Sequence, residues 1–180
     1  MAHVLNKDGY QTRLALLHVE VHLLDPLGVL VKVTPVMNTL QDNLQTVQAR
    51  ITAACAACGR NPSEVTLLAV SKTFGADAVQ EVAACRQQDF GENYIQEGVD
   101  KITFLQSTTN QNLPPIWHCI GPIQSNKTKY VAEFFNWAHT VDRLKIAQRL
   151  NDQRPAHLPP LNICLQVNID GGETKSGVAP

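Results

Sequence analysis

The stretch of sequence that decides the fold is Val65-Thr66-Leu67-Leu68-Ala69-Val70-Ser71, which leads directly into Lys72. Its centre, residues 67–70, is continuously apolar and does not alternate with polar residues. A parallel strand that is covered on both faces requires such a run, whereas a strand with one face in water alternates. We therefore expect a buried parallel strand over residues 65–71, and this strand predicts an α/β protein.

Outward from this strand, short apolar segments alternate with amphipathic segments in the manner of βα units joined by crossovers. The expected strands cover residues 65–71, 89–92, 116–120, 137–141 and 161–169. The helices expected between and after them cover residues 76–87, 94–105, 126–135 and 143–151. A further helix precedes the first strand: Asn38 and Thr39 can cap its start, Gln41 and Asp42 are placed as in a capping box, and it stops at Gly59.

Two α/β architectures fit this pattern, an open doubly wound sheet and a closed barrel. No G-x-G-x-x-G motif follows the first strand, which removes the main support for a dinucleotide-binding sheet. About five βα units are visible in the chain. A closed (β/α)8 barrel typically takes about 250 residues. A barrel built from this chain would therefore be incomplete at its C-terminal end.

Composition bounds the partners and the compartment. The 180 residues are 44% hydrophobic and 17% charged, which is typical of one globular domain. The formal net charge of −1 gives no reason to expect nucleic acid or an anionic membrane as a partner. Residues 14–33 are rich in Leu and Val, but Glu20, Asp25, Pro26 and Lys32 interrupt them, so we expect neither a spanning helix nor a secretory signal.

The cysteines indicate a reducing cytoplasm. There are five of them, an odd number spread over a mid-sized chain, which is unlike a secreted disulfide framework. Cys55 and Cys58 form a C-x-x-C, but no second pair completes a zinc site, and helix packing explains the pair better. We expect no metal site.

Lys72 is the residue most suited to chemistry. It follows the apolar strand directly, and the C-terminal ends of parallel strands form the active face of such folds. A lysine enclosed there by low-dielectric walls is more often the neutral amine that attacks an aldehyde. The spacing by itself favours the plainer alternative, a lysine that ends the strand by reaching water.

Other polar residues follow the same ends of successive strands. Asn93, His118 and Asn168 stand at or near the ends of the second, third and fifth expected strands. Taken singly, Asn93 suits a helix cap and His118 a hydrogen-bonded core histidine. Their coincidence with Lys72 at one edge of the sheet indicates a shared site.

Several motifs together resemble the pyridoxal phosphate (PLP) homeostasis proteins, which share the barrel of the N-terminal domain of alanine racemase. The resemblance runs from about Met37 to Pro180. The motifs that carry it are Leu67-Leu68-Ala69-Val70-Ser71-Lys72-Thr73, Phe90-Gly91-Glu92-Asn93-Tyr94, Trp117-His118-Cys119-Ile120-Gly121-Pro122-Ile123-Gln124-Ser125-Asn126-Lys127, His139-Thr140-Val141-Asp142-Arg143-Leu144 and Ser176-Gly177.

The resemblance implies an incomplete (β/α)8 TIM-type barrel over residues 37–180 that binds PLP as a Schiff base on Lys72. It places Asn93 and His118 around the cofactor ring. Asn168 joins this set by its position, and Lys175 is expected to supply a nearby charge or a transient second amine. The implied function is intracellular PLP (vitamin B6) homeostasis by a monomeric, non-catalytic carrier that passes PLP to apo-enzymes.

The resemblance leaves two alternative functions open, and this chain departs from the family's pattern at both ends. One alternative is an amino-acid racemase, which needs a second acid/base, usually a tyrosine from another domain. The other is a fragment that retains no PLP, because an open sheet exposes strand edges and apolar faces. Residues 1–36 have no counterpart in the family, and a mis-set start or an upstream translation artefact is favoured over a genuine extension. The chain also ends before the family's last three strands, which carry the phosphate-binding loops and the arginine that faces the pyridine nitrogen.

Overall fold

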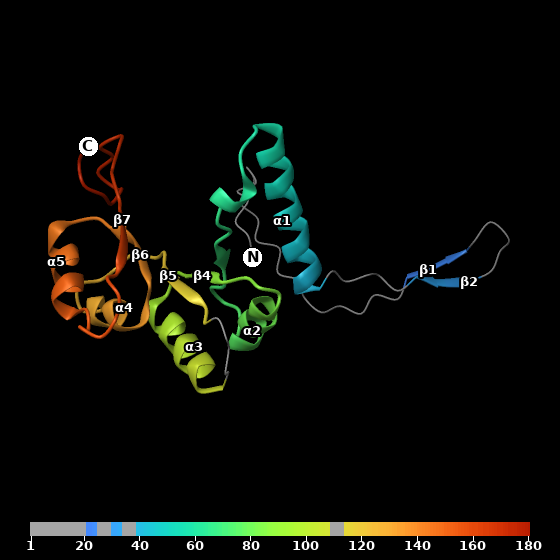
Figure 1. Ribbon diagram of the computed structural model, residues 1–180, viewed down its shortest axis with the longest axis horizontal. Coiled ribbons are helices and arrows are strands. Elements are labelled where there is room, and N and C mark those ends of the chain that lie inside the picture. The colour runs from blue at the N-terminus through green and yellow to red at the C-terminus, as the bar shows by residue number, and fades with distance from the viewer. Residues whose placement is uncertain (1–20, 25–29, 34–38, 109–113) are drawn as a thin grey trace.

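The computed structural model describes residues 21–24, 30–33, 39–108 and 114–180. Before the main domain, β1 (Val21–Leu24) and β2 (Leu30–Val33) form an antiparallel pair that lies apart from the sheet (Figure 1). The sequence did not predict this pair. Asn38 and most of the Leu- and Val-rich segment 14–33 lie outside the described residues. No described helix is long and apolar enough to cross a membrane.

The main sheet has five parallel strands, each beside its neighbour in the chain. They are β3 (Ala69–Val70), β4 (Asp89–Glu92), β5 (Ile116–Cys119), β6 (Trp137–Val141) and β7 (Asn162–Leu165), in the order β3-β4-β5-β6-β7. A doubly wound sheet reverses its strand order at a switch point, and this sheet does not. The order is that of a (β/α) barrel, which confirms the predicted fold class.

All five predicted strands are present, but the first and the fifth are shorter than predicted. Only two residues of β3 enter the ladder with β4. The carbonyl oxygen of Leu67 instead accepts a hydrogen bond of 2.6 Å from Nε2 of Gln87, whose side chain is buried. A side-chain amide thus takes the place of a strand partner at the start of β3.

The helices follow the predicted segments closely. They are α1 (Leu40–Ala57), α2 (Ala76–Ala84), α3 (Ile95–Thr108), α4 (Thr128–Phe134) and α5 (Leu144–Gln153), with a short 3-10 helix, η1 (Pro62–Glu64). The capping box of α1 is confirmed. The Thr39 hydroxyl accepts from the backbone N–H of Asp42, and the Asp42 carboxylate accepts from the backbone N–H of Thr39.

The hydrophobic core lies between one face of the sheet and the helices. Alternate strand residues such as Phe90, Trp117 and Ala138 are buried in one cluster with side chains from α2, α3, α4 and α5. Because successive residues of a strand point to opposite faces, Gly91 and His118 belong to the other face. In a barrel this second face is the interior, so the helix layer and the candidate site lie on opposite sides of the sheet.

The last strand leaves apolar side chains in contact with solvent. Ile163, Leu165, Val167 and Ile169 recur at every second position of β7 and its continuation, and all four are exposed, Ile169 by 85%. We call these four residues the β7 stripe. It is the kind of surface expected of an incompletely covered sheet.

Candidate functional site

Lys72 leaves the sheet at the C-terminal end of β3. The ladder continues to Ser71, whose backbone N–H donates to the carbonyl oxygen of Gly91 at 3.0 Å. Lys72 and Thr73 then form a turn closed by a hydrogen bond from the Phe74 N–H to the Ser71 carbonyl oxygen at 3.1 Å. Lys72 is half-buried. Its predicted position at the end of the first barrel strand is thus what the structure shows.

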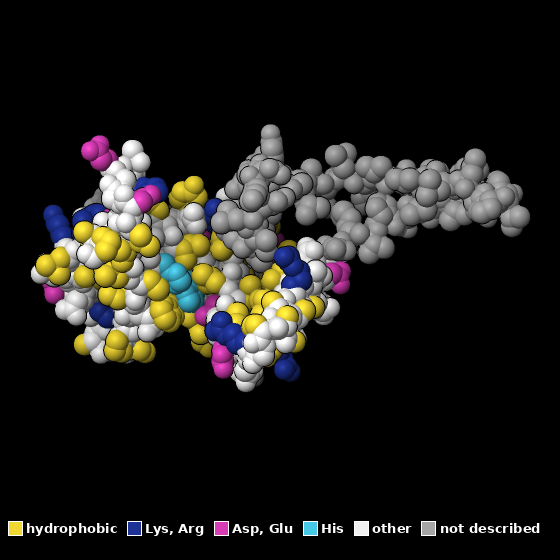
Figure 2. All heavy atoms as spheres, turned by 90° about the horizontal axis from the view of Figure 1, so that it is seen from above, with side chains coloured by type: hydrophobic (Ala, Val, Ile, Leu, Met, Phe, Trp, Pro, Cys, Tyr) yellow, Lys and Arg dark blue, Asp and Glu magenta, His cyan; other side chains and the backbone are white. Residues whose placement is uncertain are grey.

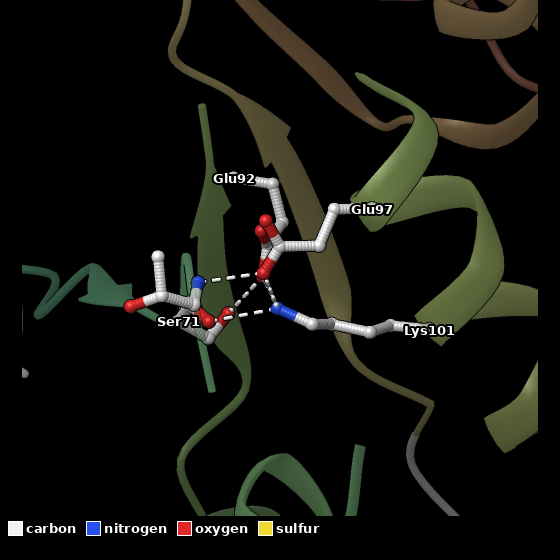
Figure 3. A network of polar contacts seen from close by, with 5 residues as sticks. Ser71, Glu92, Glu97 and Lys101 are labelled. Carbon is white, nitrogen blue, oxygen red and sulfur yellow. Dashed lines mark hydrogen bonds and ion pairs between the residues drawn. The ribbon is translucent and has the colours of Figure 1, made fainter. Parts of the chain in front are cut away.

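A buried polar network lies directly behind this turn (Figure 3). Nζ of Lys101 in α3 donates to the carbonyl oxygen of Ser71 at 2.8 Å, to Glu92 Oε1 at 2.8 Å and to Glu97 Oε1 at 2.7 Å. The Ser71 hydroxyl donates to the same Glu92 oxygen at 2.6 Å. The Lys101 ammonium therefore has an acceptor for each of its three protons.

Glu92 is the most deeply buried member of this network. Its side chain is 0% exposed. Burial raises the pKa of the Glu92 carboxyl, against the opposing effects of the hydrogen bonds from Lys101 and Ser71. Among the described residues, Oε2 of Glu92 has no hydrogen-bond partner. The negative charge is thus held in low dielectric by groups that gather on one of its two oxygens.

The sequence did not predict this network, although a signal was present. Glu97 and Lys101 stand four residues apart, and such a pair normally lies in water on the outer face of a helix. Lys101, however, also stands three residues after Gly98 and four before Leu105, both of which are buried. A lysine on the apolar face of a helix requires a buried acceptor.

His118 is joined to two other strands by its two ring nitrogens. Nε2 of His118 lies 2.9 Å from Asp89 Oδ1 in β4, and Nδ1 lies 2.9 Å from Nε2 of His139 in β6. Trp137 stacks on the His118 ring, with centroids 5.5 Å apart and planes inclined by 6°. On the face shown in Figure 2, a group of histidine side chains is bordered by hydrophobic side chains.

The hydrogen bonds and burial indicate a neutral His118. Burial lowers its pKa, and the bond to Asp89 acts in the opposite direction. Burial and the neighbouring His118 lower the pKa of His139 as well. Because the Asp89 carboxylate accepts from Nε2–H, neutral His118 must accept at Nδ1 from the N–H of His139. The three side chains thus form one directed chain.

His118 stands within β5, one residue before its end, which is near the strand end as predicted. It bonds to Asp89, the first residue of β4. The alternative stated above, a hydrogen-bonded core histidine, also fits this geometry. A place beside the cofactor ring stays a prediction.

Asn93 follows β4 and is half-buried against the end of the next strand. A Cβ atom added to Gly121 would lie only 2.0 Å from the carbonyl oxygen of Asn93. The carbonyl oxygen of Gly121 accepts from the Thr140 hydroxyl at 2.6 Å. Asn93 therefore lies at the C-terminal edge, as predicted, in close backbone contact with the glycine that follows β5.

Asn168 and Lys175 are brought together in the loop after β7. Nδ2 of Asn168 donates to the carbonyl oxygens of Gly172 and Lys175 at 3.1 and 3.4 Å. Its Oδ1 is buried and has no hydrogen-bond partner among the described residues. The Lys175 ammonium is exposed and paired with Asp170, and this contact holds the pKa of that carboxyl below its usual range. The side-chain hydrogen bonds of Asn168 and the ion pair of Lys175 stay within this loop, so a site shared with Lys72 stays a prediction.

Two hollows in the described surface contain none of the predicted cofactor residues. One of about 250 Å³ is lined by α1 and by Leu67, Gln87 and Asp89 near the starts of the strands. The other, of about 360 Å³, is lined by residues such as Trp117, Phe135 and Arg154 on the helix side. Strand-end chemistry identifies the site better than these hollows. The described residues contain no group of three or more metal-ligating side chains.

Known proteins similar to this chain carry one recurring name. The chain is 56% identical over 142 residues to the pyridoxal phosphate homeostasis protein of Escherichia coli K12 and 58% identical over 144 residues to that of Pseudomonas aeruginosa. These matches cover 79% and 80% of this chain but 60% of each relative. The chain thus spans about three fifths of the length of the curated relatives that it matches.

Solved structures show the same relationship. PipY of Synechococcus elongatus without PLP aligns with a TM-score of 0.58 and 33% identity, over 71% of this chain and 58% of PipY. The structure of PipY with PLP bound aligns with a TM-score of 0.56 and 32% identity, over 73% and 57% of the two chains. These relatives confirm the resemblance that the strand-end motifs predicted.

The family model that matches describes the N-terminal domain of alanine racemase. The match covers residues 38–180, which include the five-stranded sheet and every candidate site residue. The match, the strand order of a (β/α) barrel and the lysine after its first strand agree with one another. This chain belongs to the alanine racemase N-terminal domain family.

Proposed function

We propose that this chain belongs to a non-catalytic, PLP-binding protein of PLP (vitamin B6) homeostasis and holds the cofactor as a Schiff base on Lys72. One observation carries the proposal: Lys72 leaves the first barrel strand in a turn that buried Lys101 and half-buried Glu97 hold from behind. The names of the relatives at 56% and 58% identity, and the PLP-bound structure of PipY, support PLP as the ligand.

The residues present fit the aldehyde end of PLP. Lys72 supplies a half-buried primary amine at the edge where barrel sites form. Asn168 supplies a buried amide oxygen, Oδ1, that accepts no hydrogen bond among the described residues. A buried acceptor without a donor is costly, and a bound polar ligand would relieve that cost.

The chemistry is a reversible condensation between an amine and an aldehyde. Nζ of Lys72, as the neutral amine, attacks the aldehyde carbon, a C=N bond forms and the aldehyde oxygen leaves as water. A second primary amine can displace Lys72 from that carbon, which returns the Lys72 amine and passes the aldehyde on. This exchange would let the protein deliver PLP to apo-enzymes without catalysing a reaction on a substrate.

The other candidate residues take supporting roles in this proposal. Asn93 and His118 lie around the ring, and the bonds of His118 to Asp89 and His139 present it as a neutral group. Lys175 is the transient second amine, and its ion pair with Asp170 must open before its nitrogen can react. The five cysteines are free thiols, which suits the reducing cytoplasm in which we place the protein.

One observation favours a second candidate, a chain that retains no PLP. The β7 stripe exposes four large apolar side chains, as expected of an incompletely covered sheet. An exposed apolar stripe can also mediate contacts between protein molecules, so the monomeric state stays a prediction.

The test is to purify the chain with added PLP, record the imine absorbance, reduce the imine with borohydride and locate the label by mass spectrometry. We expect the label on Lys72 and loss of colour in Lys72→Ala. Lys129→Ala, an exposed lysine in α4, is the matched control and should keep its colour. Colour retained in Lys72→Ala refutes the assignment, and colour in neither protein supports the chain that retains no PLP. Lys72-dependent exchange of an amino acid's α-proton would support a racemase instead.

A further inference from the structure

The turn that carries Lys72 contains a residue in a costly backbone conformation. Thr73 has φ = 67°, in the left-handed region that β-branched residues rarely enter. Such a conformation persists only where surrounding groups determine it, and it occurs preferentially at functional sites. The groups that determine it here come from α3 and β4.

Both peptide groups that flank the α-carbon of Lys72 are held by side chains. The peptide before it is held through the Ser71 carbonyl oxygen, which accepts from Lys101 Nζ at 2.8 Å. The peptide after it is held through the Thr73 N–H, which donates to Glu97 Oε1 at 2.6 Å. Because each peptide group is planar, fixing both of them fixes the direction in which the Lys72 side chain leaves the turn.

The two holding side chains are joined to each other and to the sheet. Glu97 Oε1 accepts from both Thr73 and Lys101, and Glu92 Oε1 anchors Lys101 to β4. Lys101 and Glu92 are 7% and 0% exposed. Buried ion pairs contribute little net stability compared with apolar packing, so stability alone does not account for this arrangement.

We propose that Glu97, Lys101 and Glu92 are positioning residues that fix the backbone of the Lys72 turn and thereby aim the Lys72 amine at its aldehyde ligand. The inference rests on the proposed function, since it concerns the same lysine. None of the three residues needs to contact the ligand, because they act on the opposite side of the sheet from it. Loss of the Glu97 bond frees the Thr73 peptide and lets the amine leave its reactive direction.

The test compares two variants at Glu97 with one control. Glu97→Ala removes the acceptor of the Thr73 N–H, whereas Glu97→Gln keeps an oxygen that can accept it. Asp100→Asn makes the same carboxylate-to-amide change on the exposed side of α3 and is the matched control. Each protein is assayed for PLP affinity by imine absorbance, for exchange of the Thr73 amide proton by NMR, and for melting temperature.

In Glu97→Ala we expect PLP affinity to fall about tenfold or more and the Thr73 amide to exchange about tenfold faster or more. Glu97→Gln should retain most of the affinity and of the amide protection, and Asp100→Asn should match the wild type in both. A protein that is merely destabilised would show a lower melting temperature with unchanged affinity. If Glu97→Ala does not fold, Glu97→Asp, which keeps the charge but shortens the side chain by one methylene, takes its place, with the same fall in affinity and the same faster Thr73 exchange expected.

Failure of this inference can be told apart from failure of the proposed function. If the wild type forms a Lys72-dependent imine and Glu97→Ala binds PLP equally well, the positioning role is overturned and the proposed function stands. If the exchange of the Thr73 amide proton is unchanged in Glu97→Ala, Glu97 does not fix the Thr73 peptide, and the positioning role is overturned whatever the PLP affinity. If the wild type forms no imine, the proposed function is overturned, and the aiming role proposed for Glu97 is overturned with it.

Discussion

The ammonium of Lys101 lies 2.8 Å from the carbonyl oxygen of Ser71, the residue that precedes Lys72. A helix side chain thus crosses the interface between the helix layer and the sheet to bind the backbone of the site. The first strand and α3 behave as one unit through this contact.

Removal of the Lys101 ammonium should destabilise the fold strongly. Lys101→Met keeps most of the aliphatic stem but leaves Glu92 and Glu97 as buried or half-buried carboxylates without a cation. Breaking a buried pair in this way costs about 3 kcal/mol or more, measurable by urea unfolding. Lys129→Met removes a cation that is 68% exposed and should stay within about 0.5 kcal/mol of the wild type. A loss below about 1 kcal/mol in Lys101→Met would contradict a paired buried charge.

The free energy of unfolding should depend on pH because the pKa of Glu92 is raised in the folded protein. A carboxyl whose pKa is raised in the folded state contributes stability that is fully present below its ordinary pKa of 4.5 and is lost as pH rises through the folded value. Glu92→Gln does not ionise, so its unfolding free energy relative to the wild type should increase as pH rises above 4.5. Urea titrations at several pH values measure this difference, and a difference that stays constant with pH would refute the assignment.

His118 should stay neutral to lower pH than an ordinary histidine. Burial lowers its pKa below 6.5, so its contribution to stability is present above pH 6.5 and is lost as pH falls through the folded value. Because Asp89 opposes this shift, Asp89→Asn should lower the pKa of His118 further. NMR titration of the ring protons measures both values, with Asp152→Asn, an exposed carboxylate in α5, as control. A measured His118 pKa above 6.5 would show that the bond to Asp89 outweighs burial.

The close approach of Gly121 to Asn93 should make a single methyl group costly. Gly121→Ala places a Cβ atom 2.0 Å from a backbone oxygen, which only a shift of the chain can relieve. We expect a loss of about 2 kcal/mol in urea unfolding. Gly172→Ala, where the nearest neighbour would be 3.4 Å away, is the control and should change stability little. Equal losses of unfolding free energy in the two variants would show that the backbone at Asn93 can shift to accommodate the methyl group.

The β7 stripe should drive association. Replacing Ile163 and Leu165 with lysine introduces charge on a surface where the two residues are 49% and 59% exposed. The double variant should bind less of an apolar dye and scatter less light at high concentration than the wild type. Leu144→Lys changes a residue outside the stripe that is 71% exposed and serves as the control. Unchanged scattering in the stripe variant would mean that the stripe does not mediate contacts.

Features written locally in the sequence were predictable, and those that depend on strand register were not. The strand before Lys72 was found because an apolar run is a local pattern, and the helix cap at Thr39 for the same reason. The bonds of His118 to Asp89 and His139 join three strands, and only the alignment of those strands brings the side chains together. No single segment of the sequence contains that information.

The Lys101 network was missed for a different physical reason. Its Glu-x-x-x-Lys spacing is shared with the many pairs that lie in water, and burial alone distinguishes it. The late start of β3 was missed because a side chain, Gln87, replaces a strand as the partner of Leu67. Gln87 binds a carbonyl oxygen that a neighbouring strand would normally bind. Lys101 is bound by carboxylates of the protein where a helix lysine is normally bound by water.

The hydrogen bond between Lys101 and the Ser71 carbonyl oxygen also has a consequence for the order in which the chain folds. Ser71 and Lys101 are 30 positions apart, and the segment between them contains only α2, β4 and the start of α3. Contacts over such short separations form faster than contacts between distant segments. We therefore expect the turn that carries Lys72 to reach its final orientation early in folding, before β6 and β7 join the sheet.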